Sequence, residues 1–289
     1  MTELTAKPVL CVVGAGAMGS QIAHQAALHH VEVRLYGRSD ERLRTSTQQC
    51  ATLLRKRVDK GSLEPDAYAA ALGRVTTTTD LERAVAGAAV IIESVSEERD
   101  TKRAVLEAIS ACAADDAVIG TNSSTLPSSF FADAVRNPGR LVNIHFMNPA
   151  LVMPLVEVVR GEHTAADTVD RAMEFARSIG KAPVLVEREV FGFVANRILF
   201  IAMQEALTLV ENGVVTAQDC DLAVRNGLGW PMGPFAIADL VGLDVVEAIL
   251  AEGERQTGQE KWVPPLLLTE RVERGELGRK TGHGFIVGN

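Results

Sequence analysis

Hydrophobic and polar residues follow two different periods along the first two thirds of the chain. Short runs rich in Val, Ile and Leu alternate with longer stretches in which apolar residues recur every three or four positions. The short runs are typical of buried strands and the longer stretches of amphipathic helices, so the pattern predicts an α/β domain with a mostly parallel sheet and helices on both faces. The predicted strands cover residues 9–13, 31–36, 75–78, 89–94, 117–121, 141–146, 155–159 and 183–186.

The pattern changes after Glu189, where the strand-like runs stop. The segment GFVANRILFIAMQEALTLVENG predicts one long apolar helix that ends at Gly213, because glycine readily adopts the left-handed conformation that closes a helix. Further helices are predicted near residues 220–228, 234–250 and 262–274. We therefore expect two domains, the α/β domain over residues 1–188 and a smaller all-α domain over residues 189–289.

Composition and charge narrow the classes of protein. The chain has 289 residues, of which 47% are hydrophobic, and this is enough for two buried cores. Its net charge of -8 argues against a nucleic acid or an anionic membrane as partner. The sequence has no signal-peptide pattern and no apolar run near the roughly 18 residues of a membrane span, so we expect a cytoplasmic protein.

Two further features concern metals and assembly. The four cysteines are far apart and form no CxxC pair, so neither a metal site nor a disulfide framework is predicted. The apolar helix over residues 193–210 must be covered on more than one side, and its domain is small. This predicts a homodimer that forms through the C-terminal helical domain.

Three glycines lie between the first predicted strand and the helix after it, in the segment VVGAGAMGSQ. Gly14 would allow a tight turn, Gly16 would let the backbone approach a pyrophosphate, and Gly19 would let helix and strand pack closely. The N–H groups at the helix N-terminus would then face the phosphates, whereas the alternative is that the glycines serve packing alone. The segment predicts a Rossmann-type domain whose dinucleotide site includes Gly14, Gly16, Ala17, Met18 and Gly19.

Seven segments resemble, in order and spacing, the L-3-hydroxyacyl-CoA dehydrogenase family, particularly its short 3-hydroxybutyryl-CoA dehydrogenase type. They are GAGAMGSQIA, AAVIIESVSEERDTK, GTNSSTLP, NIHFMNPALVMPLVEVV, VFGFVANRIL, GWPMGPFAIADLVGLDV and GELGRKTGHGF. The resemblance covers nearly the whole chain. It implies an enzyme that transfers a hydride between the 3-hydroxyl carbon of an acyl thioester and a nicotinamide cofactor.

Two residues carry the implied chemistry. His145 matches the catalytic base of the family and Glu157 the carboxylate that orients it. Hydride can leave a carbinol carbon only if the hydroxyl proton leaves too, and an imidazole that titrates near neutrality is a suitable acceptor. A carboxylate on the other ring nitrogen fixes the tautomer and stabilises the imidazolium. Taken without the family, His145 could be a satisfied polar residue at a strand end.

The resemblance assigns further residues to substrate and cofactor. Ser124 and Asn196 match residues that hydrogen-bond the substrate oxygen, and Asn122 matches an asparagine near the nicotinamide. Alternatively, Ser124 and Asn122 are turn residues and Asn196 bridges the two domains. Glu97 and Lys102 match a glutamate and a lysine at the nicotinamide side of the cofactor.

Lys102 also has a simpler interpretation. It could be a solvated helix lysine paired with a nearby acid, Asp100 or Glu98. We favour the cofactor role because of the resemblance.

Contacts to coenzyme A in the family come partly from the segment that reads LLRKRVDKGSLEP here. Arg55, Lys56 and Lys60 belong to the most basic short run of this acidic chain, which suits the phosphates of coenzyme A, although a solvated helix face is the alternative. Relatives often have lysine, glycine and lysine where this chain has Lys60, Gly61 and Ser62. The departure leaves room for an acyl group presented on a carrier protein.

Two other functions remain open at this point. The first is oxidation of a free hydroxy acid such as L-gulonate, because gulonate dehydrogenases resemble this family and use its catalytic pair. The second is a non-catalytic nucleotide-binding protein. The joint presence of Ser124, His145, Glu157 and Asn196 argues against the second, since a binding module has no use for a base with its orienting acid.

The end of the second predicted strand bears on the choice of cofactor. The family usually has an aspartate there that binds the adenosine ribose of NAD, and this chain has Gly37. Glycine leaves room for a 2′-phosphate, which Arg38 and Ser39 could bind, with Arg42 adding charge one turn later. We therefore predict NADP(H) in preference to NAD(H). Alternatively, Arg38 stacks on adenine and Ser39 caps the next helix.

Overall fold

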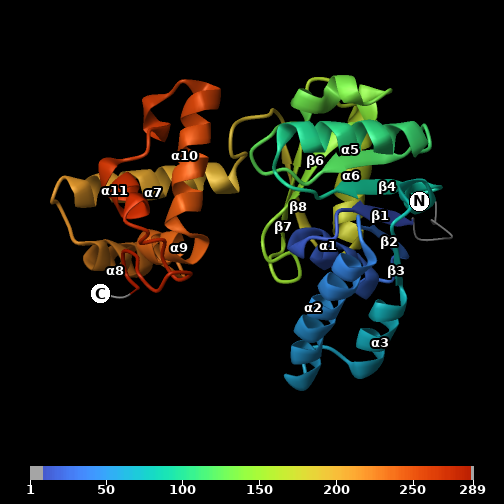
Figure 1. The fold of residues 1–289 in the computed structure, drawn as a ribbon, viewed down its shortest axis with the longest axis horizontal. Helices are drawn as coiled ribbons and strands as arrows, with labels where there is room; N and C mark the ends of the chain where they lie inside the picture. The colour runs from blue at the N-terminus through green and yellow to red at the C-terminus, as the bar shows by residue number, and fades with distance from the viewer. Residues whose placement is uncertain (1–8, 288–289) are drawn as a thin grey trace. The chain divides into compact units, whose positions relative to one another are not determined.

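The computed structural model describes residues 9–287 and divides into two compact units, one ending at Val190 and one beginning at Phe191 (Figure 1). The first unit contains one sheet of eight strands in the order β3-β2-β1-β4-β5-β6-β7-β8. Each predicted strand is present within two residues of its predicted ends. The strands are β1 (Leu10–Val13), β2 (Val33–Tyr36), β3 (Val75–Thr78), β4 (Val90–Glu93), β5 (Val118–Thr121), β6 (Leu141–Phe146), β7 (Leu155–Val159) and β8 (Ala182–Val186).

The sheet is mostly parallel, as predicted. Among the strands of residues 9–287, only β6 and β7 of this sheet pair antiparallel, and β8 is again parallel to β7. The strand order reverses between β1 and β4, the point at which Rossmann folds bind dinucleotides, beyond the carboxyl ends of the strands. The helices of this unit are α1 (Ala17–Leu28), α2 (Asp40–Asp59), α3 (Pro65–Gly73), α4 (Leu81–Val85), α5 (Arg99–Cys112) and α6 (Ala166–Ser178), with 3-10 turns η1 (Ser128–Ala134) and η2 (Pro138–Arg140).

Both faces of the sheet are covered, because successive side chains of a strand point to opposite faces. Leu10 and Val12 of β1 join a core with apolar residues of α1 and α6. Cys11 and Val13 join a second core with residues of α4 and α5. Burial raises the pKa of the Cys11 thiol to about 12, so this cysteine packs as a small apolar side chain.

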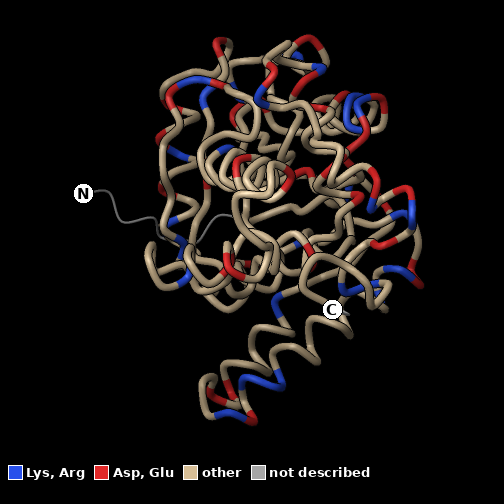
Figure 2. The backbone as a smooth tube through the Cα atoms, turned by 90° about the vertical axis from the view of Figure 1, so that its left-hand side faces the viewer, with Lys and Arg blue, Asp and Glu red and all other residues tan. Residues whose placement is uncertain are grey.

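Helices α2 and α3 form a hairpin that extends from the sheet (Figure 1). Ser39 caps α2, since its Oγ accepts from the backbone N of Arg42 at 3.3 Å. The helix ends where Gly61 takes a φ of +68° and the Ser62 hydroxyl donates to the carbonyl of Arg57 at 3.0 Å. Lys and Arg residues lie along the hairpin, and Asp and Glu residues also lie at its tip (Figure 2).

The second unit is all helical, as predicted, with two corrections. The single helix expected over residues 234–250 is two helices, because Gly242 between them has a φ of +105°, which a continuous helix cannot include. The helix expected from residue 262 begins only at Leu266, after Pro264 and Pro265. The elements are α7 (Ala195–Glu211), α8 (Ala217–Leu228), α9 (Pro234–Val241), α10 (Leu243–Thr257), η3 (Glu260–Trp262) and α11 (Leu266–Glu273).

Two buried aspartates organise this second unit. Asp239 accepts backbone N–H bonds from Phe285 and Ile286 at 2.8 Å and from Val287 at 2.9 Å, and so holds the C-terminal segment. Asp221 accepts from the first N–H groups of α9, those of residues 235 and 236. Burial raises the pKa of Asp221. The segments GWPMGPFAIADLVGLDV and GELGRKTGHGF, which contain Asp239 and Phe285, therefore have a structural explanation.

Candidate active site

The glycine turn has the geometry that a phosphate site requires. Gly14 directly follows β1 with a φ of +123°, and a Cβ on it would collide with the carbonyl of Ser94. A Cβ on Gly19 would collide with the carbonyl of Gly14. At Gly16, by contrast, no atom lies within 4 Å of the Cβ position. The first and third glycines are thus required by the fold, whereas the second opens space beside the N-terminus of α1.

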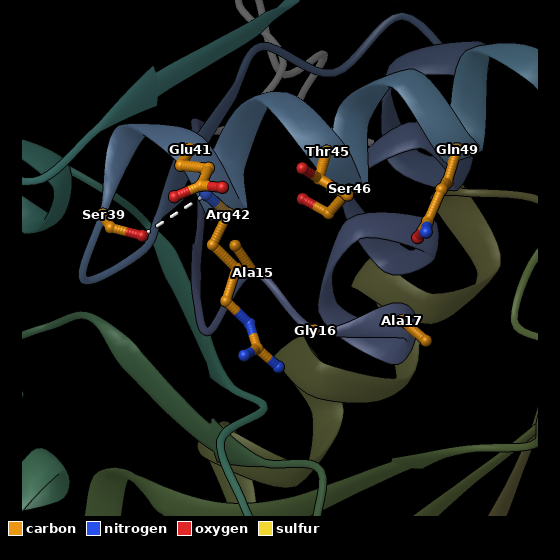
Figure 3. Close-up of a pocket in the computed structure, with 9 residues that line it drawn as sticks. All are labelled: Ala15, Gly16, Ala17, Ser39, Glu41, Arg42, Thr45, Ser46 and Gln49. Carbon is orange, nitrogen blue, oxygen red and sulfur yellow. Dashed lines mark hydrogen bonds between the residues drawn. The ribbon is translucent and has the colours of Figure 1, made fainter.

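A cavity of about 440 Å³ lies beside this turn. The side chain of Arg42 extends from α2 toward the turn at Ala15 and Gly16 (Figure 3). Arg38 is exposed and is not among the residues that line the cavity. The lining residues are Ala15, Gly16, Ala17, Ser39, Glu41, Arg42, Thr45, Ser46 and Gln49.

Gly37 is buried at the end of β2, and its surroundings restrict any side chain there. A Cβ on Gly37 would lie 2.9 Å from the Cβ of Ala15 and 2.9 Å from the Cγ of Leu43. The glycine therefore does more than remove an acid. It lets β2, the glycine turn and α2 approach one another.

His145 and Glu157 face each other across β6 and β7, where the register pairs them directly. The Nδ1 of His145 lies 2.9 Å from Oε2 of Glu157, and both side chains are buried. A ring that donates its Nδ1–H to this carboxylate has Nε2 as its basic nitrogen. The family resemblance implied contact between these two residues, and the structure has it.

Asn122 ties the end of this strand pair to the neighbouring loops. Its Oδ1 accepts from the backbone N of Phe146, the residue after His145, at 2.8 Å. Its Nδ2 donates to Oγ of Ser94 at 3.3 Å. Asn143, two residues before His145, donates through Nδ2 to the carbonyl of Ser123 at 3.4 Å. These bonds fix the loop after β5 relative to His145.

Lys102 and Glu97 belong to a buried ion network. The Nζ of Lys102 lies 3.0 Å from Glu93 and 3.1 Å from Glu97, and the lysine side chain is 1% exposed. The alternative of a solvated lysine paired with Asp100 or Glu98 is therefore wrong. Burial alone would lower the pKa of Lys102, but the two carboxylates outweigh it and raise that pKa.

The side chain of Glu97 is 35% exposed, and it holds the loop that follows β5. Its Oε1 accepts from Oγ of Ser123 at 2.5 Å and from the backbone N of Ser124 and of Thr125, both at 2.9 Å. Burial would raise the pKa of Glu97, but Lys102 and these donors lower it to about 2.

Glu93 is the member of this network that the sequence analysis missed. It ends β4 and is completely buried. A signal was present, since an acid that closes the apolar run AAVIIE is costly to bury unless it has partners.

The remaining predicted residues lie in different places. Ser124 is half-buried in the loop after β5, and Asn196 is in the first turn of α7 in the second unit. The guanidinium of Arg55 stacks on the ring of Tyr68, 4.7 Å from its centroid. Lys56, in the last turn of α2, and Lys60, directly after that helix, are both exposed.

Among residues 9–287, no group of three or more His, Cys, Asp or Glu side chains is placed to hold a metal ion. The same part of the chain has no helix with the length and apolarity needed to cross a membrane.

The fold and the glycine turn define a dinucleotide-binding protein of the Rossmann class. Residues 9–190 match the family model described as 3-hydroxyacyl-CoA dehydrogenase, NAD binding domain, and residues 192–287 match the C-terminal domain of the same family. The chain therefore belongs to the 3-hydroxyacyl-CoA dehydrogenase family and is an oxidoreductase with an NAD-binding domain. The predicted family, fold class and enzyme class are confirmed.

Individual relatives support the same family. The chain is 35% identical over 274 residues to a probable 3-hydroxybutyryl-CoA dehydrogenase of Deinococcus radiodurans, covering 95% of this chain and 98% of that protein. It is 36% identical to the 3-hydroxyadipyl-CoA dehydrogenase of Escherichia coli over 95% of this chain but 58% of that protein. The crystal structure of the (S)-3-hydroxybutyryl-CoA dehydrogenase PaaH1 of Ralstonia eutropha superposes with a TM-score of 0.93, at 30% identity, covering 98% of this chain and 99% of that one.

Proposed function

We propose that this enzyme interconverts an L-3-hydroxyacyl-CoA of the 3-hydroxybutyryl-CoA class and the corresponding 3-ketoacyl-CoA. The observation that carries the proposal is the buried pair in which Nδ1 of His145 lies 2.9 Å from Oε2 of Glu157. A base oriented by a carboxylate is what oxidation of a secondary alcohol needs.

In the proposed reaction, Nε2 of His145 takes the proton of the 3-hydroxyl as the C3–H bond breaks and the carbonyl forms. The bound nicotinamide supplies the hydride acceptor. Glu157 keeps the imidazole in the tautomer with Nδ1–H and stabilises the imidazolium that results. In the reverse direction, His145 returns the proton to the 3-oxygen.

Ser124 and Asn196 are proposed to hydrogen-bond oxygen atoms of the substrate, and Asn122 to lie near the nicotinamide. Glu97 and Lys102 are proposed to shape the nicotinamide side of the site, with the carboxylate of Glu97 as the more accessible of the two groups. The first unit would thus hold the cofactor and the base, and the second would serve substrate binding and dimerisation.

Lys56 and Lys60 are the proposed contacts for the coenzyme A phosphates, with a smaller contribution from Arg55 because it stacks on Tyr68. Lys56→Gln and Lys60→Gln should raise the KM for acetoacetyl-CoA. They should leave the KM for acetoacetyl-N-acetylcysteamine, which lacks the phosphates, unchanged. An equal effect on both thioesters would remove these lysines from the phosphate site. The departure at Ser62 is accounted for by its bond to Arg57, which closes α2, and does not by itself favour a carrier protein.

For the cofactor we propose NADP(H), with Arg42 as the principal partner of the 2′-phosphate. Support comes from the missing acid at Gly37 and from the direction of the Arg42 side chain (Figure 3). Glu41 lines the same cavity and opposes an anion, which limits the preference.

Steady-state kinetics with NADPH and NADH test this choice. Wild-type enzyme should prefer NADPH, and Gly37→Asp should shift the preference toward NADH. Gly37→Ala is the control, because it crowds Ala15 and Leu43 without adding charge. Arg42→Ala should raise the KM for NADPH, whereas Arg44→Ala, also exposed on α2, should not. A clear wild-type preference for NADH would refute the assignment.

The substrate class is tested by comparing turnover of (S)-3-hydroxybutyryl-CoA, the same acyl group on a carrier protein, and L-gulonate. The proposal requires the highest kcat/KM with the coenzyme A thioester. Activity on L-gulonate alone would overturn it.

We further propose a homodimer formed by the second unit. Large apolar side chains are exposed on its helices, including Ile198 at 60% and Leu228 at 69%. Analytical ultracentrifugation should find a dimer that Leu228→Glu or Ile198→Glu weakens, whereas a monomeric wild type would contradict the proposal. A cytoplasmic location stays a prediction.

A further inference from the structure

We propose that Glu93 is a positioning residue for the reaction. Through Lys102 and Glu97, it holds the loop over residues 123–125 in the conformation that presents Ser124 to the substrate. The inference rests on the proposed function for its kinetic consequence, but the contacts that carry it are independent of the substrate.

Glu93 is fully partnered although it is completely buried. Its Oε1 accepts from Nζ of Lys102 at 3.0 Å and from the backbone N of Val95 at 2.7 Å. Its Oε2 accepts from Oγ1 of Thr121 at 2.7 Å and lies 3.3 Å from the same Nζ. Four contacts from β5, α5 and the loop after β4 thus fix both oxygens of this carboxylate.

Lys102 links this fixed carboxylate to Glu97. With Nζ held against Glu93 at one side, its other close carboxylate contact is Oε2 of Glu97 at 3.1 Å. A lysine side chain carries much rotamer freedom, which a buried partner removes. Glu93 therefore determines where the ammonium group meets Glu97.

Glu97 in turn fixes the conformation of the loop over residues 123–125. While Oε2 faces Lys102, Oε1 collects donors from three consecutive residues, Ser123, Ser124 and Thr125. The bond to the backbone N of Ser124 fixes the residue proposed to bind the substrate oxygen. Asn143 connects the same loop to β6, the strand of His145.

An ion pair that served stability alone would need no connection to the loop of Ser124. Here, Lys102 and Glu97 connect the buried Glu93, at the end of β4, to that loop. Loss of the Glu93 charge should let Lys102 shift toward Glu97, pull Oε2 inward and loosen the amides of Ser124 and Thr125. A misplacement of about 1 Å at a reacting centre can cost roughly 100-fold in rate.

The test compares Glu93→Gln with Asp239→Asn. Both remove the charge of a buried carboxylate, but Asp239 holds the C-terminal segment and has no bond to the loop. In Glu93→Gln we expect kcat with acetoacetyl-CoA to fall about 10- to 100-fold, with the cofactor Kd changed less than about threefold. Amide hydrogen exchange at Ser124 and Thr125 should be faster. In Asp239→Asn, assayed well below its Tm, kcat and exchange at the loop should stay at wild-type values.

Glu93→Asp keeps the experiment decisive if Glu93→Gln does not fold. It keeps the charge that faces Lys102 but withdraws the carboxylate by one methylene, so a smaller loss of kcat, again with faster loop exchange, is expected. The inference is overturned if loop exchange is unchanged in the folded variant, or if Asp239→Asn lowers kcat equally. Failure of the proposed function is a separate result, because wild-type enzyme would then not turn over the thioester while the exchange data still test the network.

Discussion

Buried acids occur in both units of this enzyme, and their partners differ. In the first unit, the buried Glu93 shares the ammonium group of Lys102 with the more exposed Glu97, and the buried Glu157 faces His145. In the second unit, Asp221 accepts from backbone N–H groups of α9, and Asp239 accepts from backbone N–H groups of residues 285–287.

The partners of these carboxylates distinguish a role in the reaction from a role in holding the fold together. A carboxylate that caps a helix or a chain segment contributes stability, and its effect ends with the segment it holds. A carboxylate that orients a lysine or an imidazole controls a group whose protonation or position can matter for a reaction. Burial alone therefore does not show whether an acid serves stability or the reaction, whereas its hydrogen-bond and ion-pair partners do.

Removal of Lys102 should have the largest effect on stability. Lys102→Met leaves Glu93 buried without a counter-ion, and breaking a buried pair in this way costs about 3–5 kcal/mol. The matched control is Lys280→Met in the second unit, whose exposed pair with Asp244 is worth about 1 kcal/mol or less. Chemical denaturation of both variants provides the measurement, and equal losses would contradict the distinction between buried and exposed pairs.

Loss of the Glu157 carboxylate should act on activity more than on stability. Glu157→Gln keeps the shape of the side chain but no longer stabilises the imidazolium, so kcat should fall about 100- to 1,000-fold. Steady-state kinetics at saturating thioester check this prediction. Retention of more than about a tenth of wild-type kcat would show that Glu157, like Asp239, serves the fold and not the reaction.

Asp239→Asn should show the opposite separation. The substitution replaces one carboxylate oxygen with an NH2 group, which cannot accept from the backbone N–H groups of the C-terminal segment. The loss should cost about 1–3 kcal/mol of unfolding free energy. The kcat measured well below the Tm should stay within about twofold of wild type. A large loss of kcat without loss of stability would show that this clamp takes part in the reaction.

The pH dependence of stability should differ in sign between the two kinds of acid. The pKa of Glu97 is lowered to about 2, below its ordinary 4.5, so its contribution to stability is present above pH 4.5 and is lost as the pH falls toward 2. The advantage of wild type over Glu97→Gln should therefore shrink over that range.

Asp221 provides the contrast. Burial raises its pKa above the ordinary 3.8, so the folded state holds the proton more tightly and gains stability as the pH falls through that raised pKa. Wild type should gain relative to Asp221→Asn on acidification. Denaturation curves at several pH values test both signs, and parallel curves would refute the assignment.

Sequence patterns predicted the sheet well because buried parallel strands are continuous apolar runs between turn residues. The break at Gly242 was missed because helical periodicity continues across it, and only the positive φ reveals the interruption. Strand register was also not available from the pattern, and the direct pairing of His145 with Glu157 depends on the antiparallel return of β7.

The candidate site was predicted less completely. The glycine turn follows from local spacing and the His145–Glu157 pair was implied by the family resemblance, but the burial of Lys102 depends on tertiary packing. Glu93 was missed because its partners Lys102 and Thr121 are 9 and 28 residues away in sequence. Long-range polar networks of this kind leave little trace in a single sequence.

The most direct test of the account is the single-turnover rate of hydride transfer from (S)-3-hydroxybutyryl-CoA in wild type and in His145→Gln. With the cofactor bound equally in both, the account predicts a decrease of about 100-fold or more in the variant, because the 3-hydroxyl has lost its base. An unchanged rate in His145→Gln would contradict the proposed role of the His145–Glu157 pair.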